Sequence, residues 1–282
     1  MNGKNIFNPA KILIFCGFAM ASTVAQAGNI LLTGHDTDDH SASNFMNWGL
    51  TYLTTGNGTV VPATPTARIG YIGNSSPTLS SYLGNYNNFE FYDLDSPTWT
   101  DAFTDSNAVL VIGSGFDFVS SGGSATLNAA AAQFATYFNG GGSLFVNTHQ
   151  GLGQGFYAFL PPVGNASASD LTTCSSEPGD GSCMRPTIAG ALVGLDLSEI
   201  AQASITHNQF SGFEPTFVSL EEYVPTGNAI TIGLIGGRID DGGFGTCGLP
   251  GQPACAVPEP ETLPLLGLGL LGLSFMIRRR RA

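Results

Sequence analysis

Lysine is absent from residues 28–257, and charged residues are scarce throughout, at 11% of the 282-residue chain. The same segment holds three arginines (Arg68, Arg185 and Arg238) against 19 acidic residues, a net charge of −16. A body of this charge cannot neutralise the phosphates of DNA or RNA, which excludes nucleic acid as a partner. The scarcity of charge does not indicate disorder, because 43% of the residues are hydrophobic and supply enough apolar surface for a core.

Recognisable cofactor motifs are also missing. The glycine-rich stretches at 113–115 and 140–142 match neither the dinucleotide-binding pattern nor the P-loop pattern. The acidic stretch at 36–40 lacks the glycine and glutamate spacing of an EF-hand. The 38 glycines show no G-X-Y period, which excludes collagen. No strong motif requires a cofactor, and the sequence does not show which cofactor, if any, the protein binds.

Residues 1–27 have the three parts of a secretory signal peptide. Lys4 and Lys11 form the basic region, residues 12–21 form the apolar stretch, and Ala25-Gln26-Ala27 is a small-residue cleavage site. Ten apolar residues are too few to span a bilayer. We expect export of the chain and cleavage after Ala27.

The C-terminus also has three parts in order: Val257-Pro258-Glu259-Pro260, an apolar stretch at 262–277, and Arg278 to Arg281. Sixteen helical residues reach about 24 Å, and arginine side chains can extend to the interface of a ~30 Å hydrocarbon core. We therefore predict a single transmembrane helix over 262–277 in a sorting region at 258–282. The four arginines predict that this flank is cytoplasmic and that the body lies outside.

This tail resembles the PEP-CTERM sorting signal of Gram-negative bacteria in all three parts. The resemblance implies that exosortase, a membrane protease-transpeptidase, cuts at the motif and passes the body to the cell surface. It implies exosortase and the export machinery as partners, and a membrane-anchored precursor that becomes a cell-surface or extracellular protein. The alternative is a plain anchor that is never cut, although a plain anchor does not need the Pro-Glu-Pro sequence.

Four cysteines remain after removal of the signal peptide, and an even number in an exported chain favours disulfides. Their spacing lacks the C-x2-C pattern of zinc sites. Of the three possible connectivities, the local one is the simplest, with each bond contributing roughly 2–3 kcal/mol through loop closure. It pairs Cys174 with Cys183 and Cys247 with Cys255.

Short apolar strands alternate with helices along the body. Apolar periodicity predicts helices from Ser41 to about residue 55 and over 124–138, with shorter helical pieces beginning at Pro77 and Gly155. Strands are predicted at 28–33, 68–73, 89–94, 108–113, 143–147 and 229–235.

Strands separated by helices predict βαβ units wound right-handedly. We therefore expect one flavodoxin-like, three-layer α/β domain over 28–245 with a mostly parallel sheet. Ser/Gly/Asn/Pro-rich residues 163–186 are expected to be a disulfide-stapled surface insertion, and residues 246–257 a Gly/Pro/Cys-rich linker.

Four residues are candidates for catalysis: His35, Asp36, His149 and His207. In open parallel sheets ligands bind beyond the carboxyl ends of the strands, and the first three of these residues follow two predicted strands. Adjacent strands lie about 4.8 Å apart, so we expect His35 and His149 to share a polar pocket in which Asp36 orients one imidazole. Imidazole and carboxylate together supply an acid, a base or metal ligands.

The cluster at 35–40 has two further interpretations. His35, Asp36, Asp38, Asp39 and His40 are candidate metal ligands. Alternatively, the three aspartates favour the positive end of the helix that starts near Ser41. His149, in turn, can be a strand-end histidine bonded to backbone.

A second resemblance covers about residues 29–160. The order strand-Gly34-His35-Asp36, strand-Gly113-Ser114-Gly115 and Gly140 to His149 is similar to ThuA-like proteins and the class I glutamine amidotransferase-like fold. The resemblance implies a flavodoxin-like domain with a site at the strand ends. Where the amidotransferases carry a nucleophilic cysteine this chain has Thr148-His149-Gln150, so an acyl-enzyme glutaminase lacks its nucleophile. ThuA-like proteins carry a histidine near this position, which His149 matches.

Two functions follow from these observations. The first is a cell-surface protein whose domain is a binding or structural module of the envelope or its polysaccharide matrix. The alternative is an exported hydrolase-like or metal-dependent enzyme, carbohydrate-related, acting at the His35/His149/His207 face. We favour the first function because the nucleophile of the resembled fold is missing.

Overall fold

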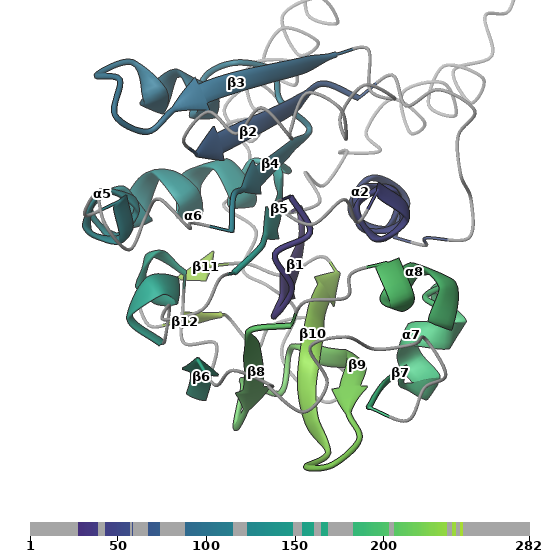
Figure 1. The fold of residues 1–282 in the computed structure, drawn as a ribbon. Helices are drawn as coiled ribbons and strands as arrows, with labels where there is room; N and C mark the ends of the chain where they lie inside the picture. The colour runs from purple at the N-terminus through teal and green to yellow at the C-terminus, as the bar shows by residue number, and fades with distance from the viewer. Residues whose placement is uncertain are drawn as a thin grey trace, which may run out of the picture. The chain divides into compact units, whose positions relative to one another are not determined.

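The structure is a computed structural model, and its described residues all lie in one compact unit, residues 27–256. They are residues 28–38, 43–56, 58, 67–73, 88–114, 123–148, 154–160, 165–168, 183–202, 206–235, 239–240 and 243–244. Ten strands form one sheet, shown in Figure 1, and two more, β11 (Ile239–Asp240) and β12 (Gly243–Phe244), form a separate short hairpin.

One half of the sheet is parallel, in the order β3-β2-β4-β5-β1. The strands are β1 (Asn29–Thr33), β2 (Ile69–Gly73), β3 (Phe89–Asp93), β4 (Val109–Ile112) and β5 (Ser143–Val146). Every residue of β2, β4 and β5 is buried, as expected for parallel strands covered on both faces.

The other half is antiparallel and begins where β10 pairs with β1. It contains β6 (Asn165–Ala168), β7 (Met184–Pro186), β8 (Asn208–Ser211), β9 (Val218–Tyr223) and β10 (Asn228–Ile235). β10 pairs with both β8 and β9, β8 pairs with β6, and β9 pairs with β7. A tight turn reverses the chain between β9 and β10, and Gly227 in it has a φ of 73°, a conformation that glycine adopts at little cost.

The prediction of a mostly parallel sheet is wrong, since the sheet is mixed. All six predicted strands are present. The last of them, β10, runs antiparallel to β1, because β10 is connected to the preceding strand β9 by a hairpin turn and not by a helical crossover. The predicted insertion at 163–186 likewise has its ends, β6 and β7, in the main sheet. The flavodoxin-like topology is not confirmed, whereas the mixed α/β class is.

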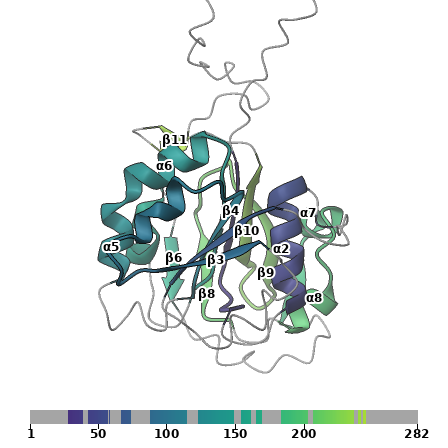
Figure 2. The same ribbon diagram turned by 90° about the horizontal axis from the view of Figure 1, so that it is seen from above.

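Helices cover both faces of the sheet and give three layers, as Figure 2 shows. α5 (Gly123–Ala129) and α6 (Ala131–Asn139) lie on one side. α2 (Ser43–Thr55), α7 (Ile188–Leu192) and α8 (Leu197–Gln202) lie on the other. Alternate strand residues enter the two cores: Ile30 and Leu32 pack with Phe134 and Phe138, whereas Leu31 packs with Phe45 and Leu50.

The helix predicted over 124–138 is interrupted. Ala130, with φ −95° and ψ 12°, separates α5 from α6, and its N–H bonds to the carbonyl of Leu127 at 3.0 Å in a tight turn. The predicted apolar face is present, since Leu127, Phe134 and Phe138 are fully buried. Between β3 and β4 the structure adds the 3₁₀ helix η2 (Trp99–Phe103), and after β5 it has η3 (Gln154–Phe159), where a helical piece was predicted.

Cys183 is disulfide-bonded. The other three cysteines that follow the signal peptide lie outside the described residues, so the predicted connectivity stays a prediction. The helix predicted from Pro77, the signal peptide, the linker at 246–257 and the transmembrane helix at 262–277 also lie outside them. Among the helices that the structure describes, none combines the length and the hydropathy needed to cross a bilayer.

A carboxyl pair at the start of α8 makes stability depend on pH. The Glu199 carboxylate accepts a bond from the Asp196 N–H at 3.1 Å, and Asp196 accepts one from the Ser198 N–H at 2.6 Å. Burial, with a smaller contribution from Asp196, raises the pKa of Glu199 to about 7. Hydrogen bonding from Glu199 and then Ser198 lowers the pKa of Asp196 to about 2.

We expect Glu199→Gln to flatten the stability profile between about pH 5 and pH 8. A carboxyl group whose pKa is raised on folding contributes its full stabilisation when the pH is below its ordinary pKa. This contribution is lost as the pH rises through the raised pKa of about 7. Because the side chain is half-buried, we expect an effect below about 1 kcal/mol. Thermal unfolding across pH measures it, and identical slopes in the two proteins would contradict the assignment.

Candidate functional site

His35 lies just beyond β1 and is fully buried, with 0% of its surface exposed. Its Nε2 lies 3.0 Å from Oε1 and 2.9 Å from Oε2 of Glu221 on β9. Because a carboxylate only accepts hydrogen bonds, Nε2–H is the donor of this hydrogen bond and Glu221 is its acceptor. Nδ1 lies 2.9 Å from the hydroxyl oxygen of Thr206, which can donate to it. Both ring nitrogens are therefore occupied within the protein.

A chain of hydroxyl groups continues this network across three strands. The Thr231 hydroxyl on β10 donates to Oε2 of Glu221 at 2.6 Å. It lies 3.0 Å from the Thr33 hydroxyl on β1, which in turn accepts the His35 N–H at 3.3 Å. All these side chains are buried away from water, and the protein itself provides the acceptors of their hydrogen bonds.

An irregularity in the β9–β10 register places the carboxylate in the interior. Glu221 lies opposite Thr231, and the register shifts on both sides of Thr231. Consecutive residues Leu220 and Glu221 are consequently both buried, whereas regular alternation would bury only one of them.

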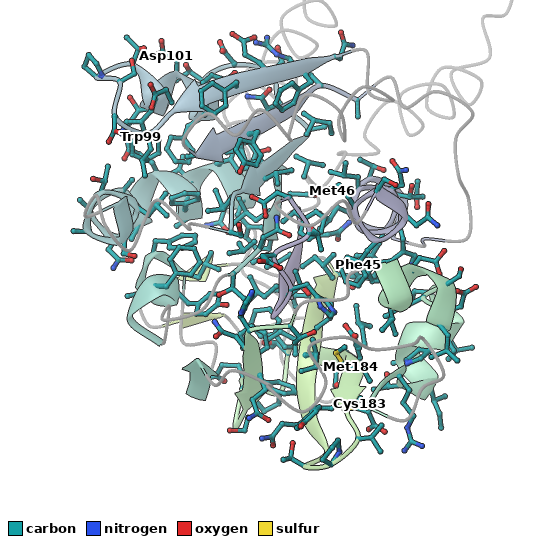
Figure 3. All side chains as sticks on the ribbon, viewed as in Figure 1. Phe45, Met46, Trp99, Asp101, Cys183 and Met184 are labelled. Atoms are coloured by element: carbon teal, nitrogen blue, oxygen red, sulfur yellow. The ribbon has the colours of Figure 1, made fainter. Side chains whose placement is uncertain are left out.

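Apolar side chains enclose the pair. The Phe45 ring on α2 meets the His35 ring edge-on, with 5.0 Å between centroids. Met184 on β7 lies below, and its sulfur is 2.9 Å from the Thr206 hydroxyl. Figure 3 labels Phe45 and Met184. His35 and Glu221, the latter on β9, thus lie between Phe45 of α2 and Met184 of β7, away from solvent.

Asp36 pairs with a different histidine. Its Oδ2 lies 3.0 Å from Nε2 of His207, and the two side chains are 1% and 10% exposed. Gly34 allows this approach, because its carbonyl accepts the His207 N–H at 2.7 Å and a Cβ on Gly34 would lie 1.9 Å from the Asn208 carbonyl oxygen. A side chain at Gly34 would separate β1 from the segment that carries His207.

Asp38 ties the end of β1 to β2 and β4. Its Oδ2 accepts hydrogen bonds from the Tyr71 hydroxyl at 2.7 Å and from the Ser114 N–H at 2.8 Å. Burial raises the pKa of Asp38, and these two bonds oppose the rise. The carboxyl ends of β1, β2 and β4 are therefore held together by polar side chains.

Three of the four candidate catalytic residues are described, and they take part in two separate pairs, one of which is completed by Glu221. His35 binds Glu221 and Asp36 binds His207, so Asp36 orients His207 and not His35. His149 lies outside the described residues. The strands on which its position depends, β1 and β5, are parallel neighbours, and the Thr148 N–H donates to the His35 carbonyl at 3.1 Å. The shared pocket of His35 and His149 stays a prediction.

The predicted metal site at residues 35–40 also stays a prediction. Asp39 and His40 lie outside the described residues, and Asp36 and Asp38 are directed to different partners. Within the described part of the chain no three His, Cys, Asp or Glu side chains lie close enough together to hold a metal ion.

The sequence reasoning missed Glu221, Thr206 and Thr231. A partial sequence signal existed for the first of these, because the apolar alternation of Val218-Ser219-Leu220 breaks at the adjacent pair Glu221-Glu222. Two adjacent glutamates in a strand suggest that one of them faces inward.

Comparison with known families identifies the C-terminal tail. Residues 256–281 match the PEP-CTERM protein-sorting motif. The motif implies an exported surface protein that exosortase processes from a membrane-anchored precursor. The motif covers only the tail, so the ThuA-like resemblance of the body has no support from it.

Other comparisons add little about the body. No curated protein matches the chain. Among solved structures, IMPa from Pseudomonas aeruginosa, in complex with an O-glycopeptide, is similar over 47% of this chain at 18% identity, with a TM-score of 0.28. This chain spans 15% of that protein. A likeness at this TM-score carries no argument about fold or function.

Proposed function

We propose that the α/β domain of this exosortase-sorted protein is a binding or structural module of the cell envelope or its polysaccharide matrix. The observation that carries the proposal is the burial of His35, whose two ring nitrogens are bonded to Glu221 and Thr206. A side chain with 0% exposure cannot touch a substrate, so His35 acts as a link between β1 and β9.

An exported hydrolase remains the second candidate, and the Asp36–His207 pair is the observation that favours it. A carboxylate that orients an imidazole is an arrangement used for general base catalysis. His207 is 10% exposed at its side chain, in contrast with the sealed His35. The two candidates differ in what loss of the His207 imidazole should do.

We expect His207→Asn to lower the melting temperature by several degrees and to leave binding to isolated envelope polysaccharide unchanged per folded molecule. The reason is that the substitution removes a buried, hydrogen-bonded partner of Asp36, at a cost of about 1–3 kcal/mol. Thermal unfolding and a co-sedimentation assay measure the two quantities. The wild-type protein should not hydrolyse 4-nitrophenyl acetate or 4-nitrophenyl glycosides. Hydrolysis by the wild type that folded His207→Asn lacks would replace this proposal with the hydrolase.

A further inference from the structure

One hollow among the described residues has a lining that includes none of the histidines. It has a volume of about 720 Å³ and lies between η2 and α6; we call it the η2 hollow. Its lining includes Asp101, Phe103, Asp105, Gln133, Thr136 and Tyr137. Asn107 and Gly142, also in its wall, lie one or two positions before β4 and β5, whereas Asp36 and Ser114 follow strands. The hollow is thus at the opposite edge of the parallel sheet, and its size is within the ~300–1,000 Å³ typical of small-molecule sites.

Two aromatic rings form the apolar part of the η2 hollow. Phe103 and Tyr137 are half-buried, and their rings meet edge-on with centroids 6.2 Å apart. The Tyr137 hydroxyl donates to the Asn107 carbonyl at 3.1 Å, and Phe103 packs against Phe134 at 4.8 Å, so both rings are held in place. Rigid aromatic surfaces provide contact area at low entropic cost, and they suit the apolar face of a sugar ring.

Polar groups surround these rings. Asp101 and Gln133 are exposed, and neither side chain makes a hydrogen bond within the part of the chain that the structure describes. Asp105 is positioned by the Tyr92 hydroxyl at 2.7 Å and by Arg68 at 3.3 Å. Carboxylate acceptors and an amide that both donates and accepts match the hydroxyl groups of a polyol. Figure 3 labels Asp101 at the outer margin of the protein, beside Trp99.

Two smaller hollows continue the surface along η2. One of about 500 Å³ shares Thr100 and Gln133 with the η2 hollow, and one of about 230 Å³ shares Asp101 and Asp105. A ligand longer than one sugar ring can therefore follow η2. The two aspartates, together with the net charge of −16 in residues 28–257, repel anionic polymers.

We propose that the η2 hollow binds an uncharged saccharide chain, with the rings of Phe103 and Tyr137 against its sugar faces and Asp101, Asp105 and Gln133 bonded to its hydroxyls. This inference rests on the proposed function, because it names the ligand class of the binding module. It places binding at the edge of the sheet opposite to the histidines.

The test titrates cellotetraose, tetra-N-acetylchitotetraose and an alginate tetrasaccharide into the purified exported protein by calorimetry. We expect one of the two neutral tetrasaccharides to bind and the alginate to show no binding. The double substitution Asp101→Ala with Gln133→Ala should weaken binding about tenfold or more, because it removes a charge-assisted and a neutral hydrogen bond. The matched control is Asp95→Ala, an exposed aspartate that does not line the η2 hollow. It should leave the affinity unchanged.

Three results would overturn the inference: no binding of either neutral tetrasaccharide, equal affinities in the double variant and the wild type, or alginate binding as tight as neutral binding. Co-sedimentation with envelope polysaccharide distinguishes this failure from failure of the proposed function. If wild type and double variant both bind the polysaccharide and do so to the same extent, the hollow is not the site and the proposed function stands. If the wild type shows a His207-dependent hydrolysis, the proposed function fails whatever the titrations show.

Discussion

Replacing Glu221 with alanine should lower the free energy of unfolding by about 3–5 kcal/mol, the cost of leaving a buried charged or polar partner unpaired. Two donors lose their acceptor at once, and a third group loses its alignment. His35 loses the carboxylate at 2.9 Å, the Thr231 hydroxyl loses its bond at 2.6 Å, and the Thr33 hydroxyl loses the direction that Thr231 imposes on it. Chemical denaturation monitored by tryptophan fluorescence measures the change.

The neighbouring glutamate provides a matched control. Glu222 pairs with Arg185 at 2.6 Å, but the two side chains are 26% and 57% exposed, so water replaces the lost bond. Glu222→Ala should cost no more than about 1 kcal/mol. A loss for Glu221→Ala as small as that for Glu222→Ala would show that the interior network does not stabilise the sheet, and it would remove the structural role that we assign to His35.

The second large effect concerns sorting. In the wild-type protein we expect mass spectrometry of the surface-exposed pool to find no peptide from residues 263–277, because exosortase removes the tail. Replacing Pro258, Glu259 and Pro260 with alanine should leave the protein in the membrane fraction with its tail intact. The reason is that the sorting motif found at residues 256–281 is read by the processing enzyme and not by the bilayer.

A matched variant separates loss of the motif from a general effect of proline removal. Pro250→Ala with Pro253→Ala changes two prolines that precede the motif, and surface delivery should be unaffected. If the intact tail dominates in the surface-exposed pool of the wild type, the protein keeps a plain anchor and the cleavage prediction is wrong.

Features that depend on neighbouring residues could be read from the sequence. The six predicted strands are all present, because each is a short apolar run whose burial follows from its own composition. The two faces of these strands enter two cores, and the apolar face of α6 follows the helical period. The sorting motif was also readable, since an enzyme recognises it as a linear sequence.

Strand direction and the partners of the buried polar groups were decided by the tertiary structure. β10 has the composition of a parallel strand, but a turn of a few residues after β9 reverses it. Local composition did not reveal this reversal, because a central strand is apolar in either direction. The tertiary structure likewise decided the break between α5 and α6 at Ala130. Helix propensity did not indicate it, since alanine is a good helix former.

The histidine cluster shows most clearly where sequence reasoning ends. Sequence alone placed His35 and Asp36 at the carboxyl end of β1, which is correct, and from this we expected Asp36 to orient an imidazole. The structure assigns His35 to Glu221, which is 186 positions away, and Asp36 to His207, which is 171 positions away. Hydrogen-bond partners at such separations depend on the register of β9 against β10 and on the close approach at Gly34. Both arise only when the antiparallel half of the sheet assembles on β1.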